Sequence, residues 1–403
     1  MGYQEKLFSL RQGGVKYSIE PMRRVAAELG HPEIGLSFVH IAGTNGKGSV
    51  AAMCSAIAEA AGLRTGLYTS PHLVSYRERF QINGEPIPEQ RLDRYLAFFE
   101  SKGWPGTFFE ISTALALLYF HDEKTDLVVW ETGMGGRFDA TNIVTPKVSV
   151  LTSIGFDHTH VLGHTLEAIA AEKAEIIKPG VPVVTSCRDP EALDVIRRKA
   201  IASGCELRII TAGELDQFDS PLLGDHQRWN TAAAVGAMRI AISGLEDDII
   251  RRGLSQVSWP GRAQWLETEP RLLLDGAHNP EAVEALVSTA AACFGGRKFQ
   301  LVFGAACDKD LAAMAEKLRK IPGIESVILV PLPHERSTPV EVLKDFFPEG
   351  ETAGSWPEAW EKVRAAGLPA LVTGSLFLVA EVLRHFAEPA ARVDVGELFS
   401  FNI

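Results

Sequence analysis

Short apolar runs alternate with amphipathic helical stretches along most of the chain. Apolar runs bounded by turn residues are typical of buried strands in a parallel sheet that helices cover on both faces. In the first part of the chain, the expected strands are 38–41, 127–130, 148–151 and 181–184. In the last part, they are 272–274, 300–303, 327–330 and 370–373. The pattern therefore predicts an α/β protein.

A change in pattern divides the chain near Trp259-Pro260-Gly261. A Pro-Gly step follows a helical segment there, and a new series of strands and helices begins soon after it. We expect an N-terminal domain of residues 1–260 with a parallel-rich sheet, and a smaller, Rossmann-like C-terminal α/β domain of residues 261–403.

The most informative loop separates the expected strand 38–41 from a helix with apolar positions at Val50, Met53, Cys54, Ile57 and Ala61. It reads Gly43-Thr44-Asn45-Gly46-Lys47-Gly48-Ser49. Glycines let backbone N–H groups face an anion, the lysine adds charge, and a hydroxyl can reach a metal. The loop departs from the general phosphate-loop pattern, since Ile41 replaces its first glycine and Gly48 separates Lys47 from Ser49. The order of strand, loop, lysine and helix nevertheless favours a P-loop ATPase-type domain over an ordinary glycine-rich turn.

Two other strand ends carry groups that can bind a metal. Glu131 ends the run 127–130, and Asp157-His158 follows the run 148–151. The carboxyl ends of parallel strands meet at one edge of a sheet, where ligands bind. Taken alone, each could also be an ordinary loop residue facing water. The glycines of 133–136 lack the spacing of a dinucleotide-binding loop, which excludes a Rossmann cofactor site there.

Lys173 occupies an unusual position on the next expected helix. Leu166, Ile169, Ala170, Ile176 and Ile177 form its apolar stripe, and Lys173 falls on the same stripe. A lysine at such a position can extend its ammonium group to the surface, or it can lose its proton and become nucleophilic. Periodicity alone leaves these two interpretations open.

Composition and charge narrow the classes of partner. The 403 residues contain 40 Lys and Arg against 51 Asp and Glu, a net charge of −11, which disfavours nucleic-acid binding. No apolar run approaches the roughly 20 residues that span a bilayer, and Met1–Arg11 lacks the apolar core of a signal peptide. The five cysteines include no C-x-x-C pair. We expect a soluble, cytoplasmic protein without nucleic-acid or membrane partners.

Five motifs follow one another along the chain: H-I-A-G-T-N-G-K-G-S-V, L-Y-T-S-P-H-L, E-T-G-M-G-G-R-F-D-A-T-N, D-H-T-H-V-L-G-H-T-L-E-A-I-A-A-E-K-A and D-G-A-H-N-P-E-A. In order and spacing they resemble the dihydrofolate synthase/folylpolyglutamate synthase family of the Mur ligase superfamily. The resemblance extends from about Val39 to Ser375-Leu376.

The resemblance implies a ligase that forms a carbon–nitrogen bond in folate biosynthesis and one-carbon metabolism. Such an enzyme adds L-glutamate to dihydropteroate, to (poly)glutamyl tetrahydrofolate, or to both, through an acyl phosphate, and releases ADP and phosphate. ATP and Mg²⁺ are the implied cofactors, and the resemblance leaves room for a monovalent cation. It also implies a monomer whose partners are small molecules.

The same resemblance assigns roles to individual residues. The implied ATP contacts are Gly43, Thr44, Asn45, Gly46, Lys47, Gly48, Ser49, Asn230, Arg262 and Asp275. The implied metal positions are Ser70, Glu131, His158 and Lys173, the last as a carbamate. Lys47, His158 and Lys173 are the implied catalytic residues. The implied substrate contacts are His72, Arg77, Phe138, Asp139, His278 and Asn279.

Several of these assignments have plain structural alternatives. Arg77 and its neighbour Arg79 could equally be surface charges. Asn279 followed by Pro280 also fits the N-cap of a helix.

Two other functions compete with this interpretation. A ligase of the same superfamily could act on another carboxylate; a nucleotide-sugar substrate is disfavoured because only about forty residues precede the phosphate loop. A nucleotide-dependent switch protein would leave Lys173, His158 and the D-G-A-H-N-P segment without roles.

Overall fold

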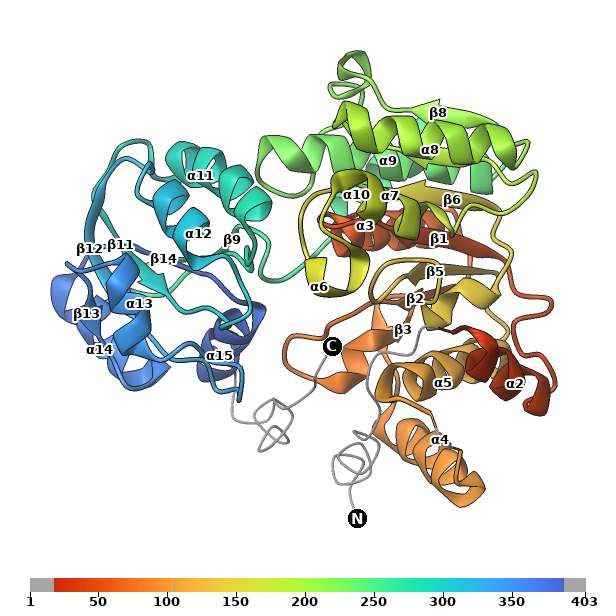
Figure 1. Ribbon diagram of the computed structural model, residues 1–403, viewed down its shortest axis with the longest axis horizontal. Helices are drawn as coiled ribbons and strands as arrows, with labels where there is room; N and C mark the ends of the chain where they lie inside the picture. Colours follow the sequence, from red (N-terminus) through yellow and green to blue (C-terminus); the bar gives the residue numbers. More distant parts are fainter. Residues whose placement is uncertain (1–17, 105, 388–403) are drawn as a thin grey trace.

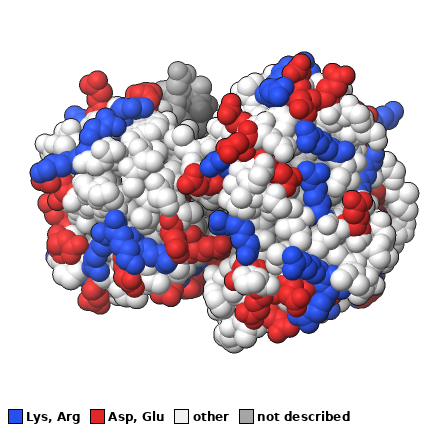
Figure 2. All heavy atoms as spheres, turned by 90° about the horizontal axis from the view of Figure 1, so that it is seen from above, with Lys and Arg blue, Asp and Glu red and all other residues white. Residues whose placement is uncertain are grey.

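Two α/β domains lie side by side in the computed structural model, which describes residues 18–104 and 106–387 (Figure 1). Seen from above, they form two adjacent lobes (Figure 2). The Met1–Arg11 stretch and the far end of the expected C-terminal domain lie outside these residues. Among the described residues, no helix combines the length and the apolar character needed to cross a membrane.

The N-terminal domain is built on a sheet in the order β4-β3-β2-β5-β1-β6-β7-β8, in which β1, β2, β5, β6, β7 and β8 run parallel. β3 and β4 extend one edge in antiparallel orientation. The strands are β1 (Phe38–Ala42), β2 (Thr65–Tyr68), β3 (Phe80–Ile82), β4 (Glu85–Pro86), β5 (Leu127–Glu131), β6 (Val148–Leu151), β7 (Val183–Thr185) and β8 (Leu207–Ile209). Because β1 lies between β5 and β6, the loops that follow these three strands are neighbours.

Helices cover both faces of this sheet. One face carries α3 (Lys47–Ala60), α9 (Asp225–Ala241) and α10 (Asp247–Ser255). The other face carries α2 (Glu20–Glu28), α4 (Glu89–Lys102) and α5 (Phe108–Asp122), and α7 (Leu166–Ala174) and α8 (Pro190–Ala202) pack near β6 and β7. The short helices are α6 (Thr159–Leu162), η1 (Tyr76–Arg79), η2 (Ala140–Ile143) and η3 (Ala212–Glu214).

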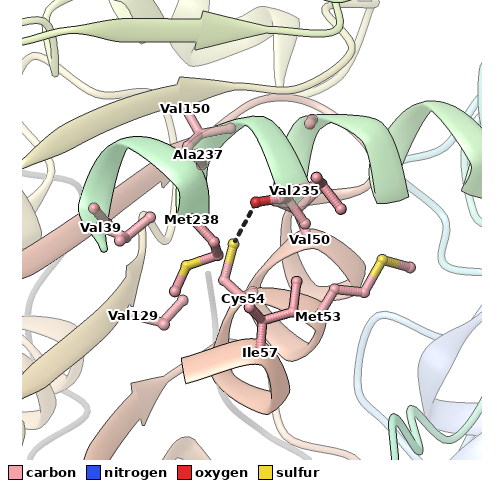
Figure 3. Packing of buried hydrophobic residues seen from close by; sticks show 14 of the residues in the cluster. Val39, Val50, Met53, Cys54, Ile57, Val129, Val150, Val235, Ala237 and Met238 are labelled. Atoms are coloured by element: carbon pink, nitrogen blue, oxygen red, sulfur yellow. Dashed lines mark hydrogen bonds between the residues drawn. The ribbon is translucent and has the colours of Figure 1, made fainter. Parts of the chain in front are cut away.

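The packing of α3 between the sheet and α9 fixes the helix that follows the phosphate loop. Val50, Cys54 and Ile57 of α3 are fully buried against Val39 of β1 and Met238 of α9 (Figure 3). A helix buried on this scale cannot shift without opening the core, so the start of α3 is a rigid support.

The C-terminal domain has a second sheet, in the order β13-β12-β11-β14-β10-β9, with only β9 antiparallel. Its strands are β9 (Gln264–Leu266), β10 (Leu272–Leu274), β11 (Phe299–Phe303), β12 (Ile324–Leu329), β13 (Glu351–Thr352) and β14 (Ala370–Thr373). One face packs against α11 (Pro280–Phe294), α12 (Leu311–Leu318) and α13 (Val340–Phe346), and the other against α14 (Trp356–Ala366) and α15 (Leu376–Phe386).

A loop of the N-terminal domain also packs into the C-terminal domain. Leu73 lies against the apolar cluster beneath α14 and α15, and Val379 of α15 approaches Gly261 beside it. The Leu73 carbonyl accepts a hydrogen bond from Arg384 of α15 at 3.3 Å. The loop after β2 therefore belongs to one domain by sequence and contacts the core of the other.

All eight predicted strands are present; 148–151, 272–274 and 370–373 have the predicted bounds, and the other five have shifted ends. The run 181–184 becomes Val183–Thr185, and the run 327–330 becomes Ile324–Leu329. The expected apolar stripe of 166–177 was too long, because α7 ends at Ala174 and Ile176 and Ile177 lie beyond it. β2, β3, β4, β8, β9 and β13 were not predicted, since each is short and carries few large apolar residues.

Candidate active site

A large cavity of about 1430 Å³ lies between the two domains. The phosphate loop, the ends of β5 and β6, and the start of α9 line it from the N-terminal domain. The loops before α11, α12 and α15 line it from the C-terminal domain. The cavity thus collects the carboxyl ends of strands from both sheets, which is where α/β proteins bind ligands.

The phosphate loop has the backbone geometry that its glycines predict. Gly46 precedes α3 with a φ of 87°, a left-handed conformation that a side chain would strain. A Cβ atom at Gly46 would lie 2.5 Å from Oδ1 of Asn230. The Lys47 Nζ donates to the carbonyl of Gly43 at 3.1 Å, so its charge is held over the loop. The start of a helix with free N–H groups and an adjacent ammonium is suited to bind phosphate.

Asn230, an implied nucleotide contact, reaches the phosphate loop from α9. It is 6% exposed, and its Nδ2 donates to Oε1 of Gln227 at 2.9 Å. Gln227 in turn donates to the Ser49 hydroxyl at 3.3 Å. Gln227 therefore holds the Ser49 end of the Gly46–Ser49 segment, and Asn230, which bonds to Gln227, lies close to Gly46 at the other end.

Glu131 is a buried carboxylate at the end of β5. It is 3% exposed and accepts the backbone N–H of Ser70 at 3.1 Å. Burial raises the pKa of Glu131 to about 7, although Lys47 and the Ser70 N–H favour its charged form. The structure brings Glu131 and Ser70 together at the same wall of the cavity as Lys47.

Lys173 faces the interior, which excludes the interpretation that its ammonium group extends to the surface. Its side chain is buried, and its Nζ donates to the carbonyl of Gly43 at 2.9 Å. Burial, with a further contribution from Lys47, lowers the pKa of Lys173 to about 7. A large share of Lys173 is consequently uncharged at neutral pH, directly below the phosphate loop.

His158 lies across the cavity from the C-terminal domain. Burial lowers the pKa of His158 to about 4, so the imidazole is neutral near pH 7. The adjacent Asp157 carboxylate accepts a hydrogen bond from Lys309 of the C-terminal domain at 2.9 Å. His278 lies 3.9 Å from the same carboxylate. The strand end that was predicted to bind a metal is therefore also a contact between domains.

Asp275, Arg262 and His278 lie together in the C-terminal domain. The Asp275 carboxylate accepts backbone N–H groups from Ala263 and Ala277, both at 2.8 Å, which ties the two loops together. Burial raises the pKa of Asp275 and the nearby Arg262 opposes the shift. Burial and Lys309 lower the pKa of His278 to about 4.

Asn279 is the N-cap of α11, with Pro280 at the first helical position. Its Oδ1 accepts the N–H of Ala282 at 2.9 Å. Its Nδ2 also donates to Oδ1 of Asn45 at 3.0 Å. The N-cap interpretation is therefore confirmed, and the same side chain also reaches the phosphate loop.

The residues expected to contact the acceptor substrate divide into two groups. Phe138 and Asp139 line the cavity, where Phe138 is 41% exposed. His72 and Arg77 are not among the lining residues; Arg77 donates instead to the carbonyl of Ile87 at 2.6 Å.

Arg79, two residues beyond Arg77, lines the cavity and is 3% exposed. Its guanidinium stacks on Phe108 at 5.2 Å and donates to His72 at 2.9 Å. The surface-charge interpretation of Arg79 is therefore wrong.

Comparison with known proteins agrees with these features. Residues 41–199 match the Mur ligase middle domain, and residues 261–376 match the Mur ligase glutamate ligase domain. The dihydrofolate synthase/folylpolyglutamate synthase of Bacillus subtilis is 35% identical, over 92% of this chain and 95% of that protein. The chain belongs to the dihydrofolate synthase/folylpolyglutamate synthase family.

Solved structures of this family share the whole fold. Mycobacterium tuberculosis folylpolyglutamate synthase complexed with ADP superimposes with a TM-score of 0.87 at 28% identity, covering 96% of this chain and 98% of that one. Escherichia coli FolC in complex with DHPP and ADP gives a TM-score of 0.86 at 31% identity, covering 97% and 98%. The similarity thus extends over both domains.

Magnesium is implied for the dihydrofolate synthase/folylpolyglutamate synthase family, and the residues present fit it. The described part of the chain holds no group of three or more His, Cys, Asp or Glu side chains placed to bind a metal ion. Mg²⁺ is instead commonly held by one or two carboxylates together with phosphate oxygens and water. A buried Glu131 beside a phosphate loop supplies such a carboxylate, and Ser70 and Ser49 supply hydroxyls.

Three cavity residues of this family member escaped the sequence analysis. Gln227 stands one helical turn before Asn230, and this spacing could have identified it. Lys309 lies in the loop after β11 as Asp157 lies in the loop after β6, which was an available signal. Glu281 bonds to Asn45 at 2.8 Å across the domain boundary, and nothing in a single sequence reports such a contact.

Proposed function

We propose that the protein is an ATP-dependent amide ligase that adds L-glutamate to dihydropteroate, to (poly)glutamyl tetrahydrofolate, or to both. The observation that carries this proposal is the cavity in which the phosphate loop, Glu131 and Lys173 face the D-G-A-H-N-P loop of the second domain. The solved structures that this chain resembles include folylpolyglutamate synthase complexed with ADP and FolC complexed with DHPP and ADP.

The proposed reaction has two steps. An oxygen of the acceptor carboxylate attacks the γ-phosphorus of ATP, a new P–O bond forms, and the bond to the β-phosphate oxygen breaks to release ADP. The amine of glutamate then attacks the acyl carbon, phosphate leaves, and the nitrogen loses its proton to water or to a neutral base. Both steps bring anions together, so the site must neutralise negative charge.

The residues of this chain meet that demand in the N-terminal domain. The backbone N–H groups of Gly43–Ser49 bind the phosphates, and Lys47 neutralises the group in transfer. Ser70 and Glu131 would hold Mg²⁺, with His158 and a carbamylated Lys173 at a second position. A bound Mg²⁺ neutralises charge on the phosphates and orients them. Asn230 and Gln227 keep the loop in place.

The C-terminal domain completes the site in the proposal. Arg262 and Asp275 contact the nucleotide, and His278 and Asn279 contact the substrates. Burial keeps the pKa of His278 at about 4, so its imidazole is neutral near pH 7. A neutral imidazole can accept a proton. We assign nucleotide and folate binding to residues 1–260 and glutamate ligation to residues 261–403. Since one chain supplies both walls of the cavity, we also propose that a monomer is active.

Lys173 carries a carbamate in the proposed active enzyme. The neutral amine attacks the carbon of CO₂, an N–C bond forms, one C–O π bond becomes an oxyanion, and the nitrogen releases a proton. Burial supplies the neutral amine that this addition requires. The test is ¹³C NMR of the protein in ¹³C-bicarbonate, with Lys173→Met as control. A carbamate signal that persists in this variant, or active enzyme with unmodified Lys173, would remove the carbamate.

The test of the function is ADP release by the purified protein with Mg²⁺, L-glutamate and either 7,8-dihydropteroate or a monoglutamyl tetrahydrofolate. Turnover with both acceptors identifies a bifunctional enzyme, and turnover with one identifies a single activity. If neither acceptor, with L-glutamate present, raises the rate of ADP release above the rate without glutamate, the folate assignment is wrong. The protein would then act on another carboxylate or serve as a switch. The same assay, run with and without a monovalent cation, tests whether the reaction requires such an ion.

A further inference from the structure

One polar contact joins the phosphate loop directly to the C-terminal domain. The Nδ2 of Asn45 donates to Oε2 of Glu281 in α11 at 2.8 Å. The Asn45 amide also exchanges hydrogen bonds with Asn279, at 3.0 and 3.3 Å. The side chain at the centre of the phosphate loop is therefore held by two residues of the other domain.

The loop after β6 leaves room for the Glu281 carboxylate and bonds to it. The Glu281 carboxylate also accepts a hydrogen bond from the Ser153 hydroxyl, in the loop after β6. A Cβ atom at Gly155 would lie 2.1 Å from Oε2 of Glu281, so only glycine allows the carboxylate to approach there. Thr44 exchanges hydrogen bonds with Gly155 at 3.0 and 3.1 Å, which links the same loop back to the phosphate loop.

α11 does not need the Glu281 side chain as its cap. Asn279 caps the first turn, and Pro280 occupies the first helical position. The Glu281 side chain instead crosses the domain boundary, where its partners are an amide and a hydroxyl. A mostly buried carboxylate is costly unless hydrogen bonds satisfy it. The groups of the N-terminal domain that satisfy it belong to the loops that hold the phosphates.

We propose that Glu281 is a positioning residue that fixes the phosphate loop from the C-terminal domain by holding the Asn45 amide. The contact aligns the loop with the D-G-A-H-N-P segment before a nucleotide binds. Apparent affinity falls when only a fraction of the molecules has the competent arrangement, so the contact raises nucleotide affinity. The inference rests on nucleotide binding at the phosphate loop, which is part of the proposed function.

The first test is binding of ADP with Mg²⁺, measured by calorimetry. Glu281→Ala removes the acceptor, and we expect a Kd about tenfold higher, which corresponds to about 1.4 kcal/mol. Glu281→Gln keeps an oxygen that accepts from Asn45 and removes only the charge, so its Kd should stay within about twofold of the parent. Glu316→Ala is the matched control, because this α12 residue pairs with Lys320 in its own domain.

The second test is hydrogen exchange of the nucleotide-free protein. In Glu281→Ala, amides of residues 43–49 should exchange faster, and Glu281→Gln should restore the parental rate. In an Asn45→Ala background, Glu281→Ala should change neither the exchange nor the Kd any further. Both readouts work without ligation, so they remain decisive even if the acceptor assignment fails.

Three results would overturn the inference. The first is a Glu281→Ala protein with the parental ADP affinity. The second is a Glu281→Gln protein as weak as Glu281→Ala, because charge and not the contact to Asn45 would then matter. The third is full additivity of Glu281→Ala with Asn45→Ala.

Discussion

Replacing Lys173 with methionine should abolish ligation and make the folded protein more stable. The side chain is buried, and burial lowers the pKa of Lys173 from 10.5 to about 7. The unfolded chain therefore binds more protons than the folded protein between about pH 7 and pH 10.5, and stability rises with pH through this window. Below pH 7 the buried charge lowers the stability of the folded protein by its full amount, and above pH 10.5 it no longer affects stability. Methionine has a similar length and no charge, so it removes this dependence.

The size of the effect follows from the pKa. Lowering the pKa of Lys173 from 10.5 to about 7 means that burial of its charge destabilises the folded protein by about 5 kcal/mol at pH 6. At pH 9 this destabilisation is about 2 kcal/mol. Losing the hydrogen bond from Nζ to the Gly43 carbonyl offsets about 1 kcal/mol at both pH values. We therefore expect Lys173→Met to gain about 4 kcal/mol at pH 6 and about 1 kcal/mol at pH 9.

The assay is urea unfolding followed by circular dichroism in buffers free of carbon dioxide, because a carbamate would replace the neutral amine. Lys320→Met is the control, since its side chain is 62% exposed and its replacement should change stability little at either pH. An equal gain at pH 6 and pH 9, or a loss at both, would refute the reasoning that burial suppresses the charge on Lys173.

Three further predictions test the site. Lys47→Ala should lower ligation about 100- to 1000-fold in the ADP-release assay without unfolding the protein, and unimpaired activity would refute the phosphate-loop assignment. Gly46→Ala should weaken ADP binding measured by calorimetry, because its Cβ would collide with Asn230 at a φ of 87°; parental affinity would contradict this geometry. Arg79→Gln should raise the KM for the acceptor about tenfold or more, whereas Arg77→Gln, whose side chain lies outside the cavity, should not; equal effects would show that the cavity wall is misassigned.

The sequence predicted the features that depend on local patterns. Buried strands such as Val148–Leu151 are continuous apolar runs, and Lys173 was noticed because a helical stripe has a fixed period. β2 was missed although it is fully buried, because Thr65 and Gly66 give no apolar signal and its burial comes from neighbouring strands. Tertiary packing creates the burial there, and periodicity does not report it.

The assignment of Arg77 in place of Arg79 has a local reason. These residues belong to a single 3₁₀ turn, Tyr76–Arg79, that the Ser75 and Glu78 side chains cap. Neighbouring side chains of such a short turn point in different directions, and neither the period of a helix nor that of a strand applies. Glu281 was missed for another reason, because its partner Asn45 lies in the other domain.

The insertion of Leu73 into the C-terminal domain affects how this enzyme can be recombined with its relatives. A chimera joined near Pro260 would leave Leu73 with one parent and its pocket around Val379 and Arg384 with the other. Such a hybrid would combine two unmatched surfaces, and its loop from Ser70 would lose part of its support. A change in the acceptor preference of such a hybrid would then result from a displaced loop as much as from an exchanged substrate site. Transferring residues 70–75 together with the C-terminal domain keeps the loop with its own pocket and separates the two effects.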